Sequence, residues 1–163
     1  LISFQFTQEK LAVLKKITDL FKQPGNHLSA IVRFLVDGIK ADRGVILIRG
    51  SGSYLPLVSY NNSGKSFKIS RTVMQSCFEE NCALLSLDTK KDEGFASSMS
   101  LVMAQVNAFV CSPISDGVKK FGVLYLDSVS AGRPFSQEDI FLVLIIARQL
   151  GVTFSRKGIP ATI

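Results

Sequence analysis

Apolar residues near the N-terminus recur every three to four positions, the spacing of a helix with one buried face. The first such run follows Thr7, a residue type that caps helices, and ends near Phe21. The second follows Asn26 and ends at Ile39, and the helix-breaking pair Pro24-Gly25 separates the two runs. The apolar positions are Leu11, Leu14, Ile17, Leu20 and Phe21 in the first run, and Leu28, Ile31, Val32, Leu35, Val36 and Ile39 in the second. The pattern predicts two amphipathic helices.

Beyond Arg43 the apolar pattern changes to short runs that are typical of β-strands. Pro56 lies inside one of these runs and indicates an edge strand, because proline cannot donate a hydrogen bond to a neighbour. Asp127 is expected to end the last strand. Helical segments are predicted at Ser70–Asn81 and Ser97–Gln105. The predicted strands are Val45–Ile48, Tyr54–Tyr60, Phe67–Ile69, Ala83–Leu87, Asn107–Ile114 and Lys119–Leu126.

The last helix has the clearest start signal in the chain. Ser136 lies three residues before Asp139, which fits a capping box, and Phe135 and Ile140 are spaced to pack together across it. The run Ile140–Ala147 is apolar on all sides, which contact with one sheet face does not require. We therefore expect this helix to have a second packing partner.

Hairpins joined by helical excursions favour an α+β fold, with an antiparallel central sheet of about six strands flanked by helices. The sheet would be built around Val45–Ile48 and Phe121–Leu126. A length of 163 residues, of which 47% are apolar, suits a single domain with its core at about residues 7–154. The chain begins at Leu1 rather than Met, so we expect a piece of a longer multidomain protein.

The net charge of +6 raises the question of nucleic acid, but the basic residues are scattered along the chain, so we expect no direct nucleic-acid contact. No run approaches the roughly 20 apolar residues of a membrane span. With no secretion signal either, we expect a cytoplasmic protein without membrane contact. The three cysteines, Cys77, Cys82 and Cys111, lack metal-ligand spacing, which indicates reduced thiols and no metal site.

Six segments, in this order and spacing, resemble the GAF domain family from about Thr7 to Phe154. They are A-D-R-G-V-I-L at Ala41–Leu47, F-K-I-S-R-T-V at Phe67–Val73, L-L-S-L-D at Leu84–Asp88, F-V-C-S-P-I at Phe109–Ile114, G-V-L-Y-L-D-S at Gly122–Ser128 and F-S-Q-E-D at Phe135–Asp139. The resemblance implies a PAS-related sheet with the N- and C-terminal helices packed together. It also implies a sensory input domain of a bacterial signalling protein, of the kind that precedes sigma-54-dependent regulators, nucleotide cyclases or histidine kinases.

The ligand signatures of that family are incomplete in this chain. Asp127-Ser128 stands where the cyclic-nucleotide signature has Asn-Lys, and Ile140 replaces its final Glu. His27, the only histidine, lies at a helix start rather than near a haem pocket, and no segment matches a bilin-attachment cysteine. We therefore expect no cofactor.

Enzymatic function has one precedent in the family, the reduction of methionine sulfoxide by cysteines. The Gly-His-x-x-Cys-Asp segment of those enzymes is replaced here by Gly94–Met99, and Cys111 lies in an apolar strand where an inert thiol is the default. We expect a non-catalytic domain, with a GAF-type free methionine sulfoxide reductase as a third alternative.

A ligand pocket, if one exists, would be bounded by the sheet and by Phe67–Thr72, Asp88–Ser100 and Phe109–Pro113. Its candidate side chains are hydroxyl, carboxyl, thiol and aromatic groups, each of which could instead cap a helix or fill the core. The candidates are Phe67, Ser70, Thr72, Asp88, Phe95, Ser98, Ser100, Cys111 and Tyr125.

Surplus apolar residues on the terminal helices indicate a homodimer. The candidate interface residues are Leu11, Leu14, Phe141, Leu142 and Ile145. The predicted function is a sensory domain that binds a small molecule, or transmits a signal to an attached output domain through these helices, or both. A structural dimerisation module without a ligand is the alternative.

Overall fold

The computed structural model describes residues 6–64, 68–90, 106–130 and 135–161. The helices are α1 (Gln8–Lys22), α2 (Leu28–Ile39), α3 (Arg71–Glu80) and α5 (Gln137–Lys157). The strands are β1 (Arg43–Arg49), β2 (Tyr54–Asn61), β3 (Leu84–Ser86), β4 (Ala108–Ser115) and β5 (Lys120–Ser128).

The strands form one sheet in the order β2-β1-β5-β4-β3, and every neighbouring pair is antiparallel. The α+β class and the antiparallel sheet are therefore confirmed, with five strands in the described residues instead of about six. Of the expected strand Phe67–Ile69, Lys68 and Ile69 do not form a strand, and Phe67 lies outside the described residues. The predicted helix at Ser97–Gln105 also lies outside them.

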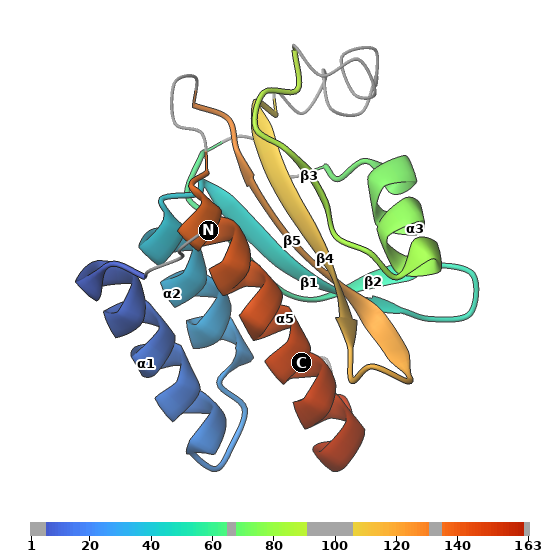
Figure 1. The fold of residues 1–163 in the computed structure, drawn as a ribbon. Helices are drawn as coiled ribbons and strands as arrows, with labels where there is room; N and C mark the ends of the chain where they lie inside the picture. The colour runs from blue at the N-terminus through green and yellow to red at the C-terminus, as the bar shows by residue number, and fades with distance from the viewer. Residues whose placement is uncertain (1–5, 65–67, 91–105, 131–134, 162–163) are drawn as a thin grey trace, which may run out of the picture.

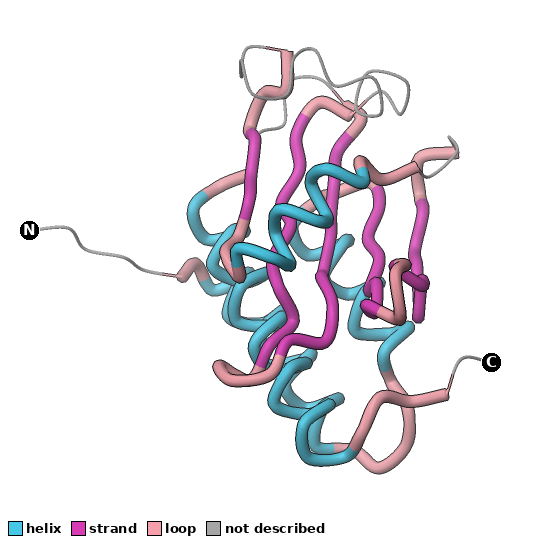
Figure 2. The backbone as a smooth tube through the Cα atoms, turned by 90° about the vertical axis from the view of Figure 1, so that its right-hand side faces the viewer, coloured by secondary structure: helices cyan, strands magenta, loops and turns pink. Residues whose placement is uncertain are grey.

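Helices cover both faces of the sheet (Figure 1). On one face, α1, α2 and α5 pack over a core that includes Ile46, Val110 and Leu124. On the other face, α3 lies across the strands, as Figure 2 shows, over a smaller core that includes Val45 and Phe109. Because β1 and β5 are sandwiched between these layers, their residues are buried on both sides and read as continuous apolar runs.

The predicted starts of α1 and α3 are confirmed by their hydrogen bonds. The Thr7 and Ser70 hydroxyls accept from the backbone N–H groups of Lys10 and Val73, which begins α1 and α3. The N-cap of α2 is His27, one residue beyond Asn26, and its side chain makes no capping hydrogen bond; the Asn26 side chain instead accepts from the backbone N–H of Leu28 at 3.0 Å. These local contacts explain why sequence alone located the helices within a residue or two.

The terminal helices pack together, as the family resemblance implied. A complete capping box joins Ser136 and Asp139 at the start of α5. The Asp139 carboxylate forms an ion pair with Lys10 of α1 at 2.7 Å, and the Thr7 hydroxyl and backbone N–H both donate to Glu138 at 3.1 Å. One end of α5 is thus tied to the start of α1.

The apolar surface of α5 is divided differently from the prediction. Leu142, expected at a dimer interface, is fully buried in the core, as is Ile146. The helix contacts both the sheet and α1, so its buried arc is wider than the single stripe that sequence spacing suggests. Leu142 is therefore a core residue, and the expectation that it contacts a second subunit is wrong.

Pro56 lies in β2, at the sheet edge, as predicted. The register between β1 and β2 shifts at Ile46/Leu47, opposite this proline. The strand β5, in contrast, does not end before Asp127 but continues through Ser128. Asp127 is paired with Arg43 of β1 across the sheet, and this pairing explains why the strand continues.

Candidate functional site

A row of four residues crosses the sheet on the face covered by α3. Ser86 of β3 pairs with Phe109 of β4, Phe109 pairs with Asp127 of β5, and Asp127 pairs with Arg43 of β1. Directly paired residues in an antiparallel sheet lie on the same face, so these side chains form one cross-strand row. All four are buried. The row places a hydroxyl, an aromatic ring and an ion pair side by side within an otherwise apolar layer.

The ion pair at one end of the row has bidentate geometry. Arg43 donates from Nε to Asp127 Oδ1 and from Nη2 to Asp127 Oδ2, both at 2.7 Å. Tyr125, two residues earlier in β5, donates its hydroxyl to Asp127 Oδ2 at 2.8 Å. Matched planar groups make the arginine–carboxylate pair the strongest kind of ionic hydrogen bond. This pairing keeps a carboxylate inside β5, which corrects the prediction that Asp127 ends the strand.

Burial has a clear electrostatic effect on this network. It raises the pKa of the Asp127 carboxyl, against the opposing effect of the Arg43 guanidinium and the Tyr125 hydroxyl. Burial also raises the pKa of the Tyr125 hydroxyl well above its usual value, and the neighbouring Asp127 charge adds to this. Tyr125 therefore stays protonated and donates to Asp127. Arg43, Tyr125 and Asp127 therefore form a fixed polar network within the apolar core beneath α3.

The opposite end of the row carries a hydroxyl without a partner. Ser86 is 1% exposed, and its Oγ forms no hydrogen bond among the described residues. A buried polar group left without a partner costs about 1–3 kcal/mol. A ligand that supplied a donor or acceptor at this position would recover that cost.

The surroundings of the row are apolar and thiol-rich. Val45, Leu47 and Val123 of the sheet and Val73 and Cys77 of α3 pack around it. Within this packed apolar layer, Ser86 and the ion pair are the polar groups, and they are held at fixed positions.

A model of the GAF domain matches residues 26–154. The chain belongs to the GAF domain family. Its fold is also that of solved GAF structures at low identity. The comparison with curated protein sequences found no relative.

Three solved structures illustrate the range of the fold. The GAF domain of a phosphoenolpyruvate-protein phosphotransferase from Coxiella burnetii is 16% identical, with 92% of this chain and 96% of that chain covered and a TM-score of 0.73. A phycocyanobilin-bound GAF domain from a cyanobacterial phytochrome is 15% identical, with coverages of 95% and 96% and a TM-score of 0.71. The free methionine-R-sulfoxide reductase of Neisseria meningitidis, solved with its substrate, is 16% identical, with coverages of 98% and 99% and a TM-score of 0.70.

The predicted ligand residues of this GAF domain fall into three groups. Cys111 and Tyr125 are buried beside the cross-strand row, where they pair with each other across β4 and β5. Ser70 is buried but serves as the N-cap of α3, while Thr72 and Asp88 are exposed. The remaining candidates, Phe67, Phe95, Ser98 and Ser100, lie outside the described residues.

Two of the candidate residues make other contacts in the structure. The Tyr125 ring is buried and stacked on Phe109, with 6.0 Å between the ring centroids. Its contribution is the hydroxyl that donates to Asp127. The Asp88 carboxylate accepts from the backbone N–H of Lys90 at 3.1 Å, which is a turn contact rather than a position inside the core.

Sequence reasoning missed Arg43, Ser86 and the role of Asp127. Arg43 stands in the A-D-R-G-V-I-L segment, directly before an apolar strand. A charged residue there and an aspartate at the end of another apolar strand are the available signals, since burial of both charges requires that they pair. Ser86 gives no such signal, because buried serines usually find a backbone partner.

The cysteines of this GAF domain are poorly suited to nucleophilic chemistry. Burial raises the pKa of the Cys111 thiol well above its usual value. Cys77 is also buried and donates from Sγ to the Cys111 carbonyl oxygen at 3.4 Å. Cys82 is exposed, and desolvation together with the neighbouring Glu80 raises its pKa. A raised pKa keeps a thiol protonated and unreactive at neutral pH.

Within the described part of the chain, no three His, Cys, Asp or Glu side chains gather in a way that could hold a metal ion. The same part contains no helix that is both long and apolar enough to span a membrane.

Proposed function

We propose that this GAF domain is a non-catalytic sensory module. It binds a small molecule on the α3 side of the sheet and passes the event through α1 and α5 to an output domain attached in the full-length protein. The observation that carries the proposal is the unpaired, buried Ser86 hydroxyl, which lies in the same cross-strand row as the Arg43–Asp127 ion pair. The phycocyanobilin-bound and substrate-bound relatives support it by analogy, since both hold small molecules on this fold.

A thermal-shift screen of nucleotides and metabolites tests this site when it is run on two serine variants. Ser86→Ala removes the unpaired hydroxyl, so the unliganded protein is expected to keep or gain stability, by about 1 kcal/mol. The same variant is expected to lose most of the ligand-induced rise in melting temperature. Ser112→Ala is the matched control, because Ser112 is also a buried serine of the sheet but lies on β4 outside the row. Equal ligand responses of the two variants would contradict the proposed site.

An empty dimerisation module is the alternative, and it predicts no saturable stabilisation by any compound of the screen. Turnover of free methionine sulfoxide, lost on Cys111→Ser or Cys82→Ser, would instead support an enzyme. The raised thiol pKa values favour the non-catalytic reading.

We further propose that signalling passes through a homodimer built on α5 and α1. Phe141, Ile145 and Val152 recur along one side of α5 and are 37–40% exposed, and Leu11 of α1 is 42% exposed. Leu14 is half-buried and packs mainly against the core of its own subunit. Side chains of this size stabilise an interface by up to about 1.5–3 kcal/mol each when fully buried, before association costs. Shifts of about 1–2 Å between packed helices are an established way to transmit binding across such an interface.

Sedimentation equilibrium at micromolar concentration tests the dimer. Phe141→Glu and Ile145→Glu are expected to give a 17.8 kDa monomer without loss of helical circular dichroism. Val118→Glu is the matched control, because Val118 is 95% exposed and lies on the β4–β5 turn rather than on α1 or α5. A wild-type chain that is already monomeric would end this proposal.

A further inference from the structure

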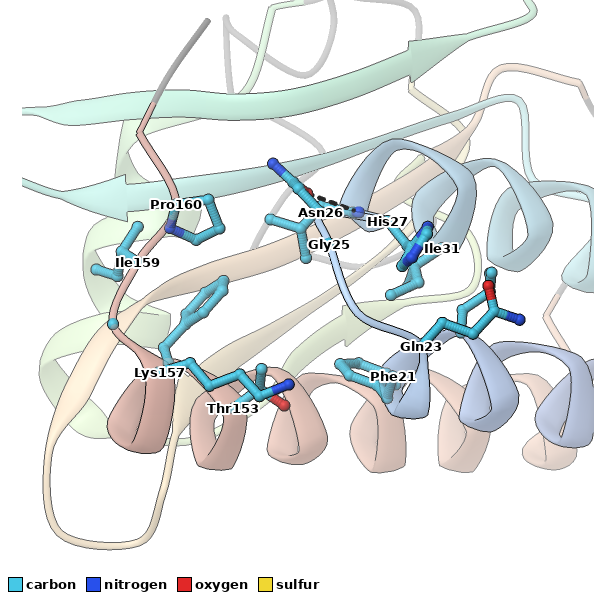
Figure 3. A pocket seen from close by; sticks show the side chains of 14 residues that line it. Phe21, Gln23, Gly25, Asn26, His27, Ile31, Thr153, Lys157, Ile159 and Pro160 are labelled. Atoms are coloured by element: carbon cyan, nitrogen blue, oxygen red, sulfur yellow. Dashed lines mark hydrogen bonds between the residues drawn. The ribbon is translucent and has the colours of Figure 1, made fainter.

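A cavity opens on the helical side of the molecule, between the loop that joins α1 to α2 and the C-terminal end of α5 (Figure 3). Its volume is about 220 Å³. None of the residues that line it belongs to the sheet, so it is separate from the cross-strand row. The lining comes from the end of α1, residues 23 and 25–27, the first turns of α2, and residues 153, 154 and 157–160.

The walls of the cavity are mainly apolar. Leu28, Ile31 and Phe154 are core residues that reach it from α2 and α5, and Ile159 and Pro160 close the side beyond α5. An engineered apolar cavity of about 150 Å³ is large enough to bind benzene. A cavity of about 220 Å³ therefore has room for a single ring together with a short polar substituent.

The polar groups of the cavity favour a negative charge. Lys157 contributes an ammonium group, and no aspartate or glutamate is among the lining residues. The Asn26 carbonyl oxygen accepts from the backbone of Leu28, which leaves the amide NH2 group of Asn26 as a donor. The first turn of α2, on the same wall, contains no acidic residue, so the positive end of its helix dipole is not neutralised there.

We propose that this cavity binds a small aromatic monocarboxylate. The ring lies against Leu28, Ile31 and Phe154, and the carboxylate faces Lys157. The site joins the end of α5 to the loop that precedes α2, so its occupation holds the end of α5 against the rest of the helical layer. This is a binding site distinct from the one proposed above, and it does not depend on it.

Phenylacetate is the probe for the first experiment, and two-dimensional amide NMR of the intact chain detects its binding. A ligand of this size is expected to bind with a Kd on the order of 1 mM. Saturable shifts are expected at residues of the cavity such as Asn26, Ile31 and Phe154, with little change at Phe109 and Asp127. Phenylacetamide, which has nearly the same shape without the charge, is expected to bind about threefold more weakly, as suits loss of a solvent-exposed ionic contact.

Two neighbouring basic residues give a matched pair of variants. Lys157→Gln removes the ammonium group that lines the cavity, while Arg156→Gln removes an equal charge from an exposed neighbour that does not line it. The first is expected to raise the Kd of phenylacetate about threefold, and the second to leave it unchanged. Thr153→Phe fills the cavity from the half-buried side of α5 and is expected to abolish the shifts while the fold is kept.

Several results would overturn the proposal. One is the absence of saturable shifts at about 20 mM phenylacetate, well above the expected Kd. Others are shifts centred on the cross-strand row, or equal effects of Lys157→Gln and Arg156→Gln. If the cavity resonances move with protein concentration in the absence of phenylacetate, a second copy of the chain occupies the site and the proposed ligand is wrong.

Discussion

Arg43 and Asp127 are expected to show strong energetic coupling in a double-mutant cycle. Arg43→Met leaves the Asp127 carboxylate buried with the Tyr125 hydroxyl as its donor and without its counter-charge. Removing one partner of a buried ion pair costs about 3–5 kcal/mol. The same range applies to Asp127→Leu, which leaves the Arg43 guanidinium buried without the carboxylate.

The double variant Arg43→Met/Asp127→Leu has a different balance. Replacing a buried ion pair by apolar residues of similar volume is often neutral or stabilising by about 1–4 kcal/mol. The Tyr125 hydroxyl then loses its hydrogen bond to the Asp127 carboxylate, at a cost of about 1–3 kcal/mol. These terms nearly cancel, so the free energy of unfolding of the double variant is expected to be close to that of the wild type. It is therefore several kcal/mol higher than adding the two single losses would predict.

Urea unfolding at low temperature, followed by far-ultraviolet circular dichroism, measures the four free energies of unfolding. Tyr125→Phe extends the cycle with a milder change of about 1.5 kcal/mol, because Asp127 Oδ2 retains its bond from Arg43 Nη2. Arg33→Met is the control for loss of an arginine at an exposed position, with an expected effect within about 0.5 kcal/mol. A cost below about 1 kcal/mol for Arg43→Met, or a double variant equal to the sum of the singles, would refute this account of the network.

Two further predictions concern Gly151 of α5 and Asp116 of the β4–β5 turn. A Cβ at Gly151 would collide with the backbone of Ser115 in β4, so Gly151→Ala is expected to lower the free energy of unfolding by about 1–3 kcal/mol. In a helix with open space at this position the same substitution would stabilise the protein. An unchanged urea midpoint would contradict this prediction. Backbone N–H groups of Lys119 and Val118 lower the pKa of Asp116 to about 2, so its stabilising contribution is present above about pH 4 and is lost as the pH falls toward 2. The melting temperature of Asp116→Asn is therefore expected to fall less than that of the wild type over that pH range. An equal fall for the two proteins would count against the prediction.

The sequence by itself determined the four helices of the described residues, the edge strand and the family. Thr7, Ser70 and Ser136 each cap a helix through a hydrogen bond to a residue three positions away. Because the two residues are close in sequence, the sequence alone predicts the contact. Pro56 marked β2 as an edge strand for an equally local reason, since it lacks an N–H to donate. The terminal helices could be expected to pack together from the family resemblance, although the contacts that join them could not.

Only the tertiary structure decided which charged and apolar residues meet. Arg43 and Asp127 are 84 residues apart, and they face each other because of the register between β1 and β5. That register turns an apparent strand end into the centre of a buried network. Leu142 is in the core and Phe141 at the surface because α5 packs against the sheet and α1 at once, which sequence periodicity does not encode. The unpaired hydroxyl of Ser86 likewise follows from its neighbours in space, because no local contact satisfies it.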